Sequence, residues 1–159
     1  MKQVRKSVLL CHAPNEIYRL VADVEAYPRF LPWCERAEVL ARDDQGQTAR
    51  LHLAYSGIRH AFTTKTVEVP GRSVLIDLVD GPFSLLDGHW EFVPLSLPTG
   101  DGATGDAVAG EGACRIDFEM RYAFSNALLE RAIGPVFDRI ADTFVDSFVR
   151  RAEQVYGAR

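Results

Sequence analysis

Residues 27–34 of this chain read Tyr27-Pro28-Arg29-Phe30-Leu31-Pro32-Trp33-Cys34. Pro28 and Pro32 lack a backbone N–H, and each disfavours helix in the residue before it. A regular helix therefore cannot continue through this segment, and we predict a bent connection, which we call the elbow (residues 27–34). Because the elbow is rich in aromatic side chains, either other parts of the protein cover it or it contacts an apolar molecule.

A strand pattern and a helix pattern precede the elbow. Residues 4–11 are apolar and β-branched enough to predict a first strand. Pro14 suits the first turn of a helix. Apolar residues then recur at helical spacing, at Ile17, Leu20, Val21 and Val24. The order up to the elbow is therefore strand, then helix.

Six further strands are predicted after the elbow, near residues 37–42, 49–56, 58–69, 73–80, 86–92 and 114–124. The last two alternate most regularly between apolar and polar side chains. Such alternation is typical of an antiparallel sheet with one buried face and one face in water. Residues 96–111 are rich in Gly, Asp, Thr and Ala and predict a loop. The spacing of Asp101, Asp106 and Glu111 does not fit an EF-hand-like calcium loop.

The pattern becomes helical from Asn126 to the end of the chain. An apolar stripe recurs there, made of Leu129, Ile133, Val136, Phe137, Ile140, Phe144, Phe148 and Val155. Gly134-Pro135 predicts a break between a short first piece and a long second piece, because proline fits only the first turn or a kink. The whole order predicts an α+β fold, with about seven antiparallel strands and a long C-terminal helix, in one domain covering residues 1–159.

Composition and charge set limits on function. The 159 residues are 47% hydrophobic and 25% charged, with a net charge of -4. This balance is ordinary for a globular protein and gives no electrostatic support for DNA binding. Cys11, Cys34 and Cys114 show no metal or redox spacing, so we expect reduced thiols in a cytoplasmic protein. No apolar run is long enough for a signal peptide or a membrane span.

The predicted plan implies a cavity. Seven strands about 4.8 Å apart make a sheet about 30 Å wide, whereas one helix covers about 10–12 Å. The sheet must therefore curl around the helix, and an apolar space remains unless large side chains fill it. The candidate lining residues are Leu86, Trp90, Phe92, Phe118, Met120, Phe137, Ile140 and Phe144, with Tyr27, Phe30, Leu31 and Trp33 at or near the mouth. The alternative is that these side chains fill the space as ordinary core.

Motifs for catalysis are missing from the sequence. His12, His52, His60 and His89 form no metal-binding pair, so we predict no metal site. There is no nucleophile elbow, P-loop or dinucleotide fingerprint. Glu68 shares its side of the strand with Phe62 and is a candidate lone acid, although a wet or edge position is the simpler interpretation. We therefore expect a protein without enzymatic activity, and a cyclase-like small-molecule enzyme is the lesser alternative.

Three blocks of sequence resemble a known family. The elbow is similar to the Y-P-x-F-x-P-W-C signature of the coenzyme Q-binding START-like family, which unites the mitochondrial coenzyme Q chaperone and the bacterial ribosome association toxin RatA. Residues 81–83 and 86–95 resemble its second block, which adds Phe83 to the candidate ligand-binding residues. Residues 148–157 resemble its closing helix. The resemblance covers nearly the whole chain, and the long loop at 96–111 is the chief departure.

The resemblance implies a helix-grip fold and two functions. The first is non-enzymatic carriage of ubiquinone or a similar isoprenoid lipid in support of respiration, without another cofactor and with transient contact at the inner membrane. The second is binding to the large ribosomal subunit, which blocks subunit association. The sequence favours the first, because no basic stripe for ribosomal RNA is visible. Five arginines would be the candidates for such a stripe if folding gathers them, namely Arg29, Arg36, Arg42, Arg59 and Arg72.

Overall fold

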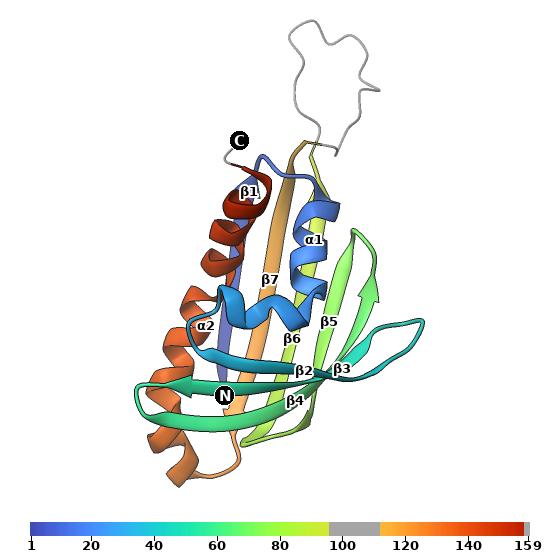
Figure 1. Cartoon of the computed structure of the whole chain (residues 1–159). Coiled ribbons are helices and arrows are strands. Elements are labelled where there is room, and N and C mark those ends of the chain that lie inside the picture. The colour runs from blue at the N-terminus through green and yellow to red at the C-terminus, as the bar shows by residue number, and fades with distance from the viewer. Residues whose placement is uncertain (96–111, 158–159) are drawn as a thin grey trace, which may run out of the picture.

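A curved antiparallel sheet wraps around a long helix in the computed structural model, which describes residues 1–95 and 112–157 (Figure 1). The strands lie in the order β1-β7-β6-β5-β4-β3-β2, and every neighbouring pair is antiparallel. This confirms the predicted α+β class and element order.

The elements are β1 (Lys2–Leu10), α1 (Pro14–Ala22), the 3₁₀ helix η1 (Val24–Arg29), β2 (Cys34–Arg42), β3 (Gln47–Tyr55), β4 (Ile58–Val69), β5 (Ser73–Asp80), β6 (Phe83–Pro94), β7 (Cys114–Phe124) and α2 (Ala127–Tyr156). The assignment of residues 1–159 to one domain stays a prediction, and the loop predicted at 96–111 lies outside the described residues.

The two central strands follow the predicted alternation. In β6, Gly88, Trp90 and Phe92 are buried, and their cross-strand partners in β7 are Met120, Phe118 and Ile116. The residues between them point to the outer face and are polar. The concave face of the sheet therefore carries the core, as the period-2 pattern requires.

The elbow is covered by other parts of the protein. Helix α1 packs against β5, β6 and α2, while η1 packs against β2. Pro28 lies inside η1, whose tighter turn ends the regular helix at Ala22. Tyr27, Leu31 and Trp33 are buried, and Phe30 is half-buried. The elbow thus closes one end of the concave face.

The prediction of a helix break at Gly134-Pro135 is wrong. Helix α2 runs without interruption from Ala127 to Tyr156, with Pro135 in its interior. Asn126 caps its N-terminus, because the Asn126 Oδ1 accepts a hydrogen bond of 2.9 Å from the backbone N–H of Leu129. Ile133 and Phe137, on either side of the proline, are buried against the sheet. Packing of this apolar stripe outweighs the local helix-breaking tendency of proline.

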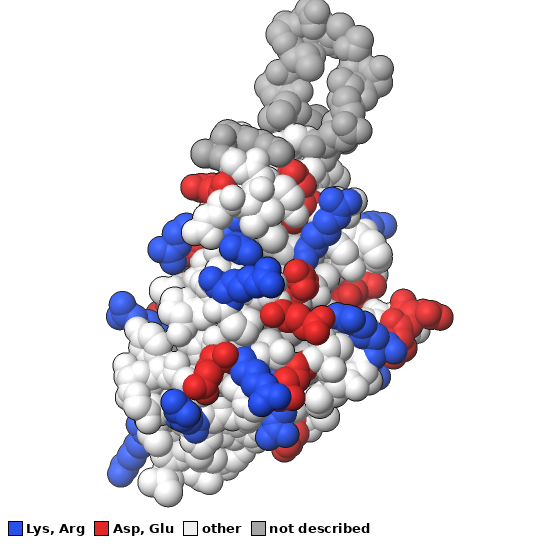
Figure 2. Space-filling model, in the orientation of Figure 1, with Lys and Arg blue, Asp and Glu red and all other residues white. Residues whose placement is uncertain are grey.

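Carboxylates interrupt the candidate basic stripe at three of its five arginines. Arg36 pairs with Glu38 at 3.1 Å, Arg42 with Glu25 at 3.0 Å, and Arg59 with Glu35 at 3.4 Å. Arg29 and Arg72 are exposed and form no ion pair with another described residue. On the face shown in Figure 2, positive and negative side chains alternate. Three of the five arginines are thus balanced by neighbouring carboxylates.

Candidate functional site

An apolar cavity of about 70 Å³ lies between the concave face of the sheet and α2. Its wall comes from η1, the elbow, strands β3 to β7, and α2. The lining residues are Val24, Tyr27, Trp33, Ala49, Leu51, Phe62, Thr64, Thr66, Ile76, Leu86, Asp87, Gly88, Met120, Phe137, Ile140 and Phe144. Most are apolar, so the cavity suits a hydrophobic group rather than an ion.

Gly88 leaves part of this space unfilled. It occupies an inward position of β6, between Ile76 of β5 and Met120 of β7. A Cβ atom at Gly88 would lie 3.4 Å from the Ile76 Cδ1, in ordinary van der Waals contact. The glycine is therefore not needed to avoid a clash. Its effect is to keep a side chain out of the cavity.

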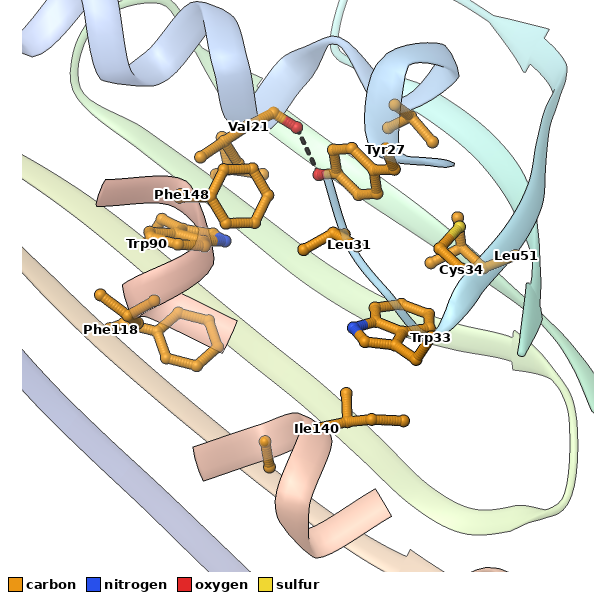
Figure 3. Close-up of a cluster of buried hydrophobic side chains, with 14 of the residues drawn as sticks. Val21, Tyr27, Leu31, Trp33, Cys34, Leu51, Trp90, Phe118, Ile140 and Phe148 are labelled. Atoms are coloured by element: carbon orange, nitrogen blue, oxygen red, sulfur yellow. Dashed lines mark hydrogen bonds between the residues drawn. The ribbon is translucent and has the colours of Figure 1, made fainter. Parts of the chain in front are cut away.

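The elbow contributes two of its four predicted residues to the wall. Tyr27 and Trp33 line the cavity, and their positions relative to the core are shown in Figure 3. Leu31 is fully buried in the core beside them. Phe30 packs away from the cavity, with its ring 5.1 Å from that of Phe148 and beneath the Arg151 guanidinium at 5.3 Å.

The sheet and α2 contribute five of the nine residues predicted on them. These five are Leu86, Met120, Phe137, Ile140 and Phe144. The other four are buried outside the wall: Phe83, Trp90, Phe92 and Phe118. The Trp90 and Phe118 rings pack at a tilt with their centroids 4.6 Å apart, and the Phe83 ring packs 4.9 Å from that of Phe137. These four side chains fill the core, as the alternative interpretation of the sequence expects. Contact between a ligand and any of the candidate residues stays a prediction.

Strand β4 supplies wall residues that the sequence did not reveal. Phe62, Thr63 and Thr64 are consecutive and all buried, because a bulge shifts the register of β4 against β5 between Thr63 and Thr64. Phe62 and Thr64 are two positions apart and share one side of the strand, but the apolar residues of β4 fall on both sides, so alternation did not assign the inward side. Ile76 opposite Gly88 could have been found from the register of β5 and β6, once the inward side of Gly88 was known.

Glu68 is neither a free acid in the cavity nor a fully wet side chain. It is half-buried and lies outside the cavity wall. Its Oε2 accepts hydrogen bonds from the Thr66 hydroxyl at 2.7 Å and the Gln47 Nε2 at 2.9 Å. The Gln47 Nε2 also donates to the Ala22 carbonyl at the end of α1, at 2.7 Å. Glu68 therefore helps to anchor α1 to strands β3 and β4.

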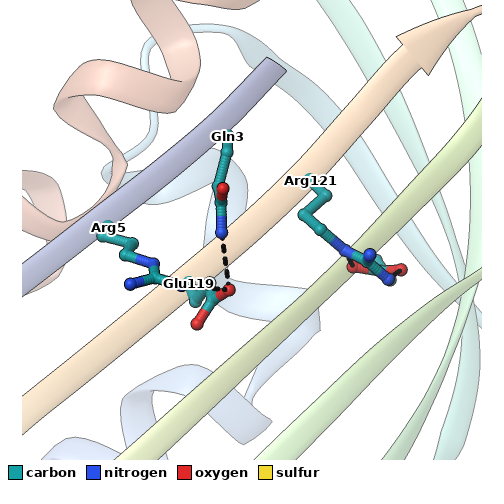
Figure 4. A network of polar contacts seen from close by, with 5 residues as sticks. Gln3, Arg5, Glu119 and Arg121 are labelled. Atoms are coloured by element: carbon teal, nitrogen blue, oxygen red, sulfur yellow. Dashed lines mark hydrogen bonds and ion pairs between the residues drawn. The ribbon is translucent and has the colours of Figure 1, made fainter. Parts of the chain in front are cut away.

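The cavity wall contains few ionisable groups. The Tyr27 hydroxyl donates to the Val21 carbonyl at 2.5 Å, and burial raises the pKa of Tyr27 above its ordinary range. The Asp87 carboxylate is held on the outer face by Arg121, at 3.0 and 2.6 Å. Figure 4 shows Arg121 beside Gln3, Arg5 and Glu119 on this outer polar face. Neither group is placed as a free acid or base inside the cavity.

The remaining candidate chemistry does not converge on the cavity. Burial raises the pKa of the Cys34 and Cys114 thiols to about 11, so both are protonated at neutral pH. His52 lies 2.6 Å from Glu38 near the outer face of β3. Within residues 1–95 and 112–157, no three His, Cys, Asp or Glu side chains lie close enough together to hold a metal ion. None of the helices in these ranges has the length and apolar character needed to cross a bilayer.

The sequence is similar to proteins of two named types. The profile of the polyketide cyclase / dehydrase and lipid transport family matches residues 10–149. The ribosome association toxin RatA of Escherichia coli is 37% identical over 159 residues, which cover 100% of this chain and 92% of that protein. The mitochondrial coenzyme Q-binding protein COQ10 of Drosophila melanogaster is 25% identical over 155 residues, covering 96% of this chain and 59% of that one.

Solved structures confirm the helix-grip fold. A START superfamily protein from Mycobacterium smegmatis has a TM-score of 0.70 and 20% identity, and the match covers 96% of this chain and 98% of that one. The ZhuI aromatase/cyclase from Streptomyces has a TM-score of 0.72 and 16% identity over 99% of both chains. At these identities the likeness establishes the fold alone.

Proposed function

This chain belongs to the polyketide cyclase / dehydrase and lipid transport family, and from that premise we propose that it binds and carries a hydrophobic small molecule of the isoprenoid quinone class. The observation that carries the proposal is the apolar cavity beneath α2, kept open by the absence of a side chain at Gly88. The name of the COQ10 relative supports ubiquinone or a similar lipid as the ligand.

The cavity must widen to accept a quinone ring. Its volume of about 70 Å³ is smaller than the roughly 150 Å³ of an engineered protein cavity that binds benzene. Two wall residues can make room. Met120 is flexible and half-buried, and Phe144 of α2 is half-buried. Ligand loading in this proposal therefore includes displacement of side chains, and membrane contact supplies the water-insoluble lipid.

Binding without catalysis fits the wall best. General acid–base chemistry needs a titratable group within hydrogen-bond reach of the reacting atoms. The ionisable wall residues are Tyr27 and Asp87, and each already has a protein partner, Val21 and Arg121. The relatives named above are a ribosome association toxin and a coenzyme Q-binding protein. A cyclase-like activity therefore remains the lesser alternative.

Solvent extraction tests the proposal directly. The full chain, purified from a bacterium that makes ubiquinone, is extracted with organic solvent and analysed for quinone by absorbance and mass spectrometry. The matched control is Gly88→Val, whose added methyl groups enter the cavity. We expect quinone with the unchanged chain and little with the variant. A clean extract from the unchanged chain, with no saturable uptake of a fluorescent apolar probe, contradicts the proposal.

Association with the large ribosomal subunit is the second candidate function. It is favoured by the 37% identity to RatA over the whole chain, which exceeds the 25% identity to COQ10. Co-sedimentation of the purified chain with large ribosomal subunits tests this function. The Gly88→Val variant, whose cavity is filled, is the control that shows whether ribosome association depends on ligand binding. Co-sedimentation together with a clean extract would make ribosome association the primary function.

A further inference from the structure

Three hydrogen-bond donors in and beside the cavity lack an acceptor among the described residues. The Trp90 indole Nε1 is fully buried and has no partner. Trp33 and Thr64 line the cavity and are 5% and 7% exposed, and neither side chain hydrogen-bonds to another described residue. An indole N–H can only donate. Buried donors of this kind are uncommon, because leaving one unpaired is unfavourable.

The two indole groups face a common region of the core. In Figure 3 the nitrogen of each ring lies on the side that faces the other ring. The Phe144 ring contacts both indoles, with centroids 6.4 Å from Trp33 and 5.7 Å from Trp90. Displacement of Phe144 would therefore extend the cavity to the Trp90 indole. The Phe148 ring, 5.2 Å from that of Trp90, offers at most a weak N–H···π contact.

We propose that this donor set recognises the carbonyl oxygens of a quinone, and that the protein binds the oxidised quinone more tightly than the hydroquinone. The inference rests on the proposed function, which it refines by naming the head-group site and the redox state. A quinone carbonyl accepts hydrogen bonds and has no O–H to satisfy. The Trp33 and Trp90 N–H groups and the Thr64 hydroxyl supply the donors, and displacement of Phe144 supplies the room.

The hydroquinone fits the same wall less well. Its two hydroxyl groups each need an acceptor when they leave water. An indole N–H cannot accept a hydrogen bond, and the Asp87 carboxylate faces Arg121 on the outer side. Of the three groups of the donor set only the Thr64 hydroxyl can also accept, so a hydroquinone oxygen placed at either indole finds no acceptor for its O–H within this set. We expect at least about fivefold tighter binding of the quinone.

Equilibrium dialysis with three probes tests this preference. The probes are decylubiquinone, the same compound reduced to decylubiquinol and kept without oxygen, and decylbenzene, which has no oxygen atom. The variants Trp33→Phe and Trp90→Phe remove one N–H each and keep an aromatic ring. We expect each variant to lose about three- to tenfold affinity for decylubiquinone and to bind decylbenzene within about twofold of the unchanged chain.

The control variant is Phe92→Leu, which alters the ring stacked on Trp90 at 6.0 Å but removes no donor. It should change binding of quinone and decylbenzene by the same factor. Equal affinity for quinone and hydroquinone in the unchanged chain overturns the inference and leaves the proposed function standing, whether or not the variants fold. Equal losses of affinity for quinone and decylbenzene in both tryptophan variants also overturn the inference and leave the proposed function standing. Failure of the unchanged chain to bind any probe overturns both.

Discussion

At the scale of single residues, Gly88 has a measurable effect on stability as well as on cavity volume. Glycine inside a strand is less stable than alanine by about 0.5–1 kcal/mol, because it loses more backbone freedom on folding. The Cβ of alanine fits at 3.4 Å from Ile76. We therefore expect Gly88→Ala to raise the free energy of unfolding by about 0.5 kcal/mol in urea titrations.

Gly46 is the contrasting control. A Cβ atom there would lie 1.9 Å from the Thr66 carbonyl oxygen, which belongs to the backbone and cannot rotate away. Gly46→Ala should therefore lower the free energy of unfolding by more than about 1 kcal/mol. If Gly88→Ala destabilises the chain as much as Gly46→Ala, the space next to Gly88 is already filled and the cavity assignment is wrong.

The three cysteines should differ in reactivity. Cys11 is exposed, whereas burial raises the pKa of Cys34 and Cys114 to about 11. Because the thiolate is the reactive form, Ellman's reagent at pH 8 should modify Cys11 alone in the folded protein and all three cysteines after unfolding. Rapid native modification of Cys34 would instead mark the elbow as open to solvent.

The raised pKa values of Cys34 and Cys114 also make the stability of the protein depend on pH. An unfolded cysteine loses its proton near pH 8.5, whereas these two keep theirs to about pH 11 when folded. The unfolded state therefore binds fewer protons between those values, and stability falls as pH rises through that window, by at most about 1.4 kcal/mol per pH unit for each thiol. The Cys34→Ala, Cys114→Ala double variant should show a shallower slope.

At the scale of elements, α2 shows where local propensity misleads. Gly134-Pro135 predicted two helices, because proline removes one hydrogen bond and crowds the preceding turn. The helix continues because Ile133, Phe137 and Ile140 must all face the sheet to bury their side chains. That requirement depends on the sheet, which lies far away in the sequence, so a local pattern could not reveal it.

Pro135 should therefore limit the stability of α2. It is exposed, so its ring contributes little packing, and its missing N–H leaves a carbonyl one turn earlier unpaired within the helix. We expect Pro135→Ala to raise the free energy of unfolding by about 1–2 kcal/mol, less than the full helix-interior penalty because alanine also loosens the unfolded chain. The exposed Ala132→Ser is a control that should change stability by less than about 0.5 kcal/mol. A loss of stability in Pro135→Ala would mean that the proline shapes a bend needed for packing.

The strands show which part of the site was predictable. Regular alternation in β6 and β7 placed Leu86 and Met120 inward correctly. Alternation gives the side of the sheet but not the position along the strand where α2 leaves space, so it could not separate Trp90, which is core, from Leu86, which lines the cavity. In β4 apolar residues fall on both sides of the strand and Thr63 is buried beside Thr64, so alternation did not assign even the inward side.

At the scale of the whole molecule, the width of the sheet predicted its curvature and overestimated the space inside. The sheet curls around α2 as expected (Figure 1). Aromatic side chains from the elbow, β6, β7 and α2 then fill most of the concave face, in a continuous set of ring contacts from Tyr27 through Phe148 to Trp90. A wide sheet therefore indicates where a cavity can form, and the sizes of the inward side chains decide how much of it remains.

Ligand binding inside this core should stabilise the whole chain. At a free concentration 100 times its dissociation constant, a ligand that binds only the folded state adds about 2.7 kcal/mol. For a chain of this size about 1 kcal/mol shifts the melting temperature by roughly 2–4 °C, so saturating decylubiquinone should raise it by about 5–10 °C. Gly88→Val should melt at an unchanged temperature with or without the quinone, measured by differential scanning calorimetry. An equal rise in both chains would place the quinone on the outer surface, because only the inner site loses space when a side chain is added at Gly88.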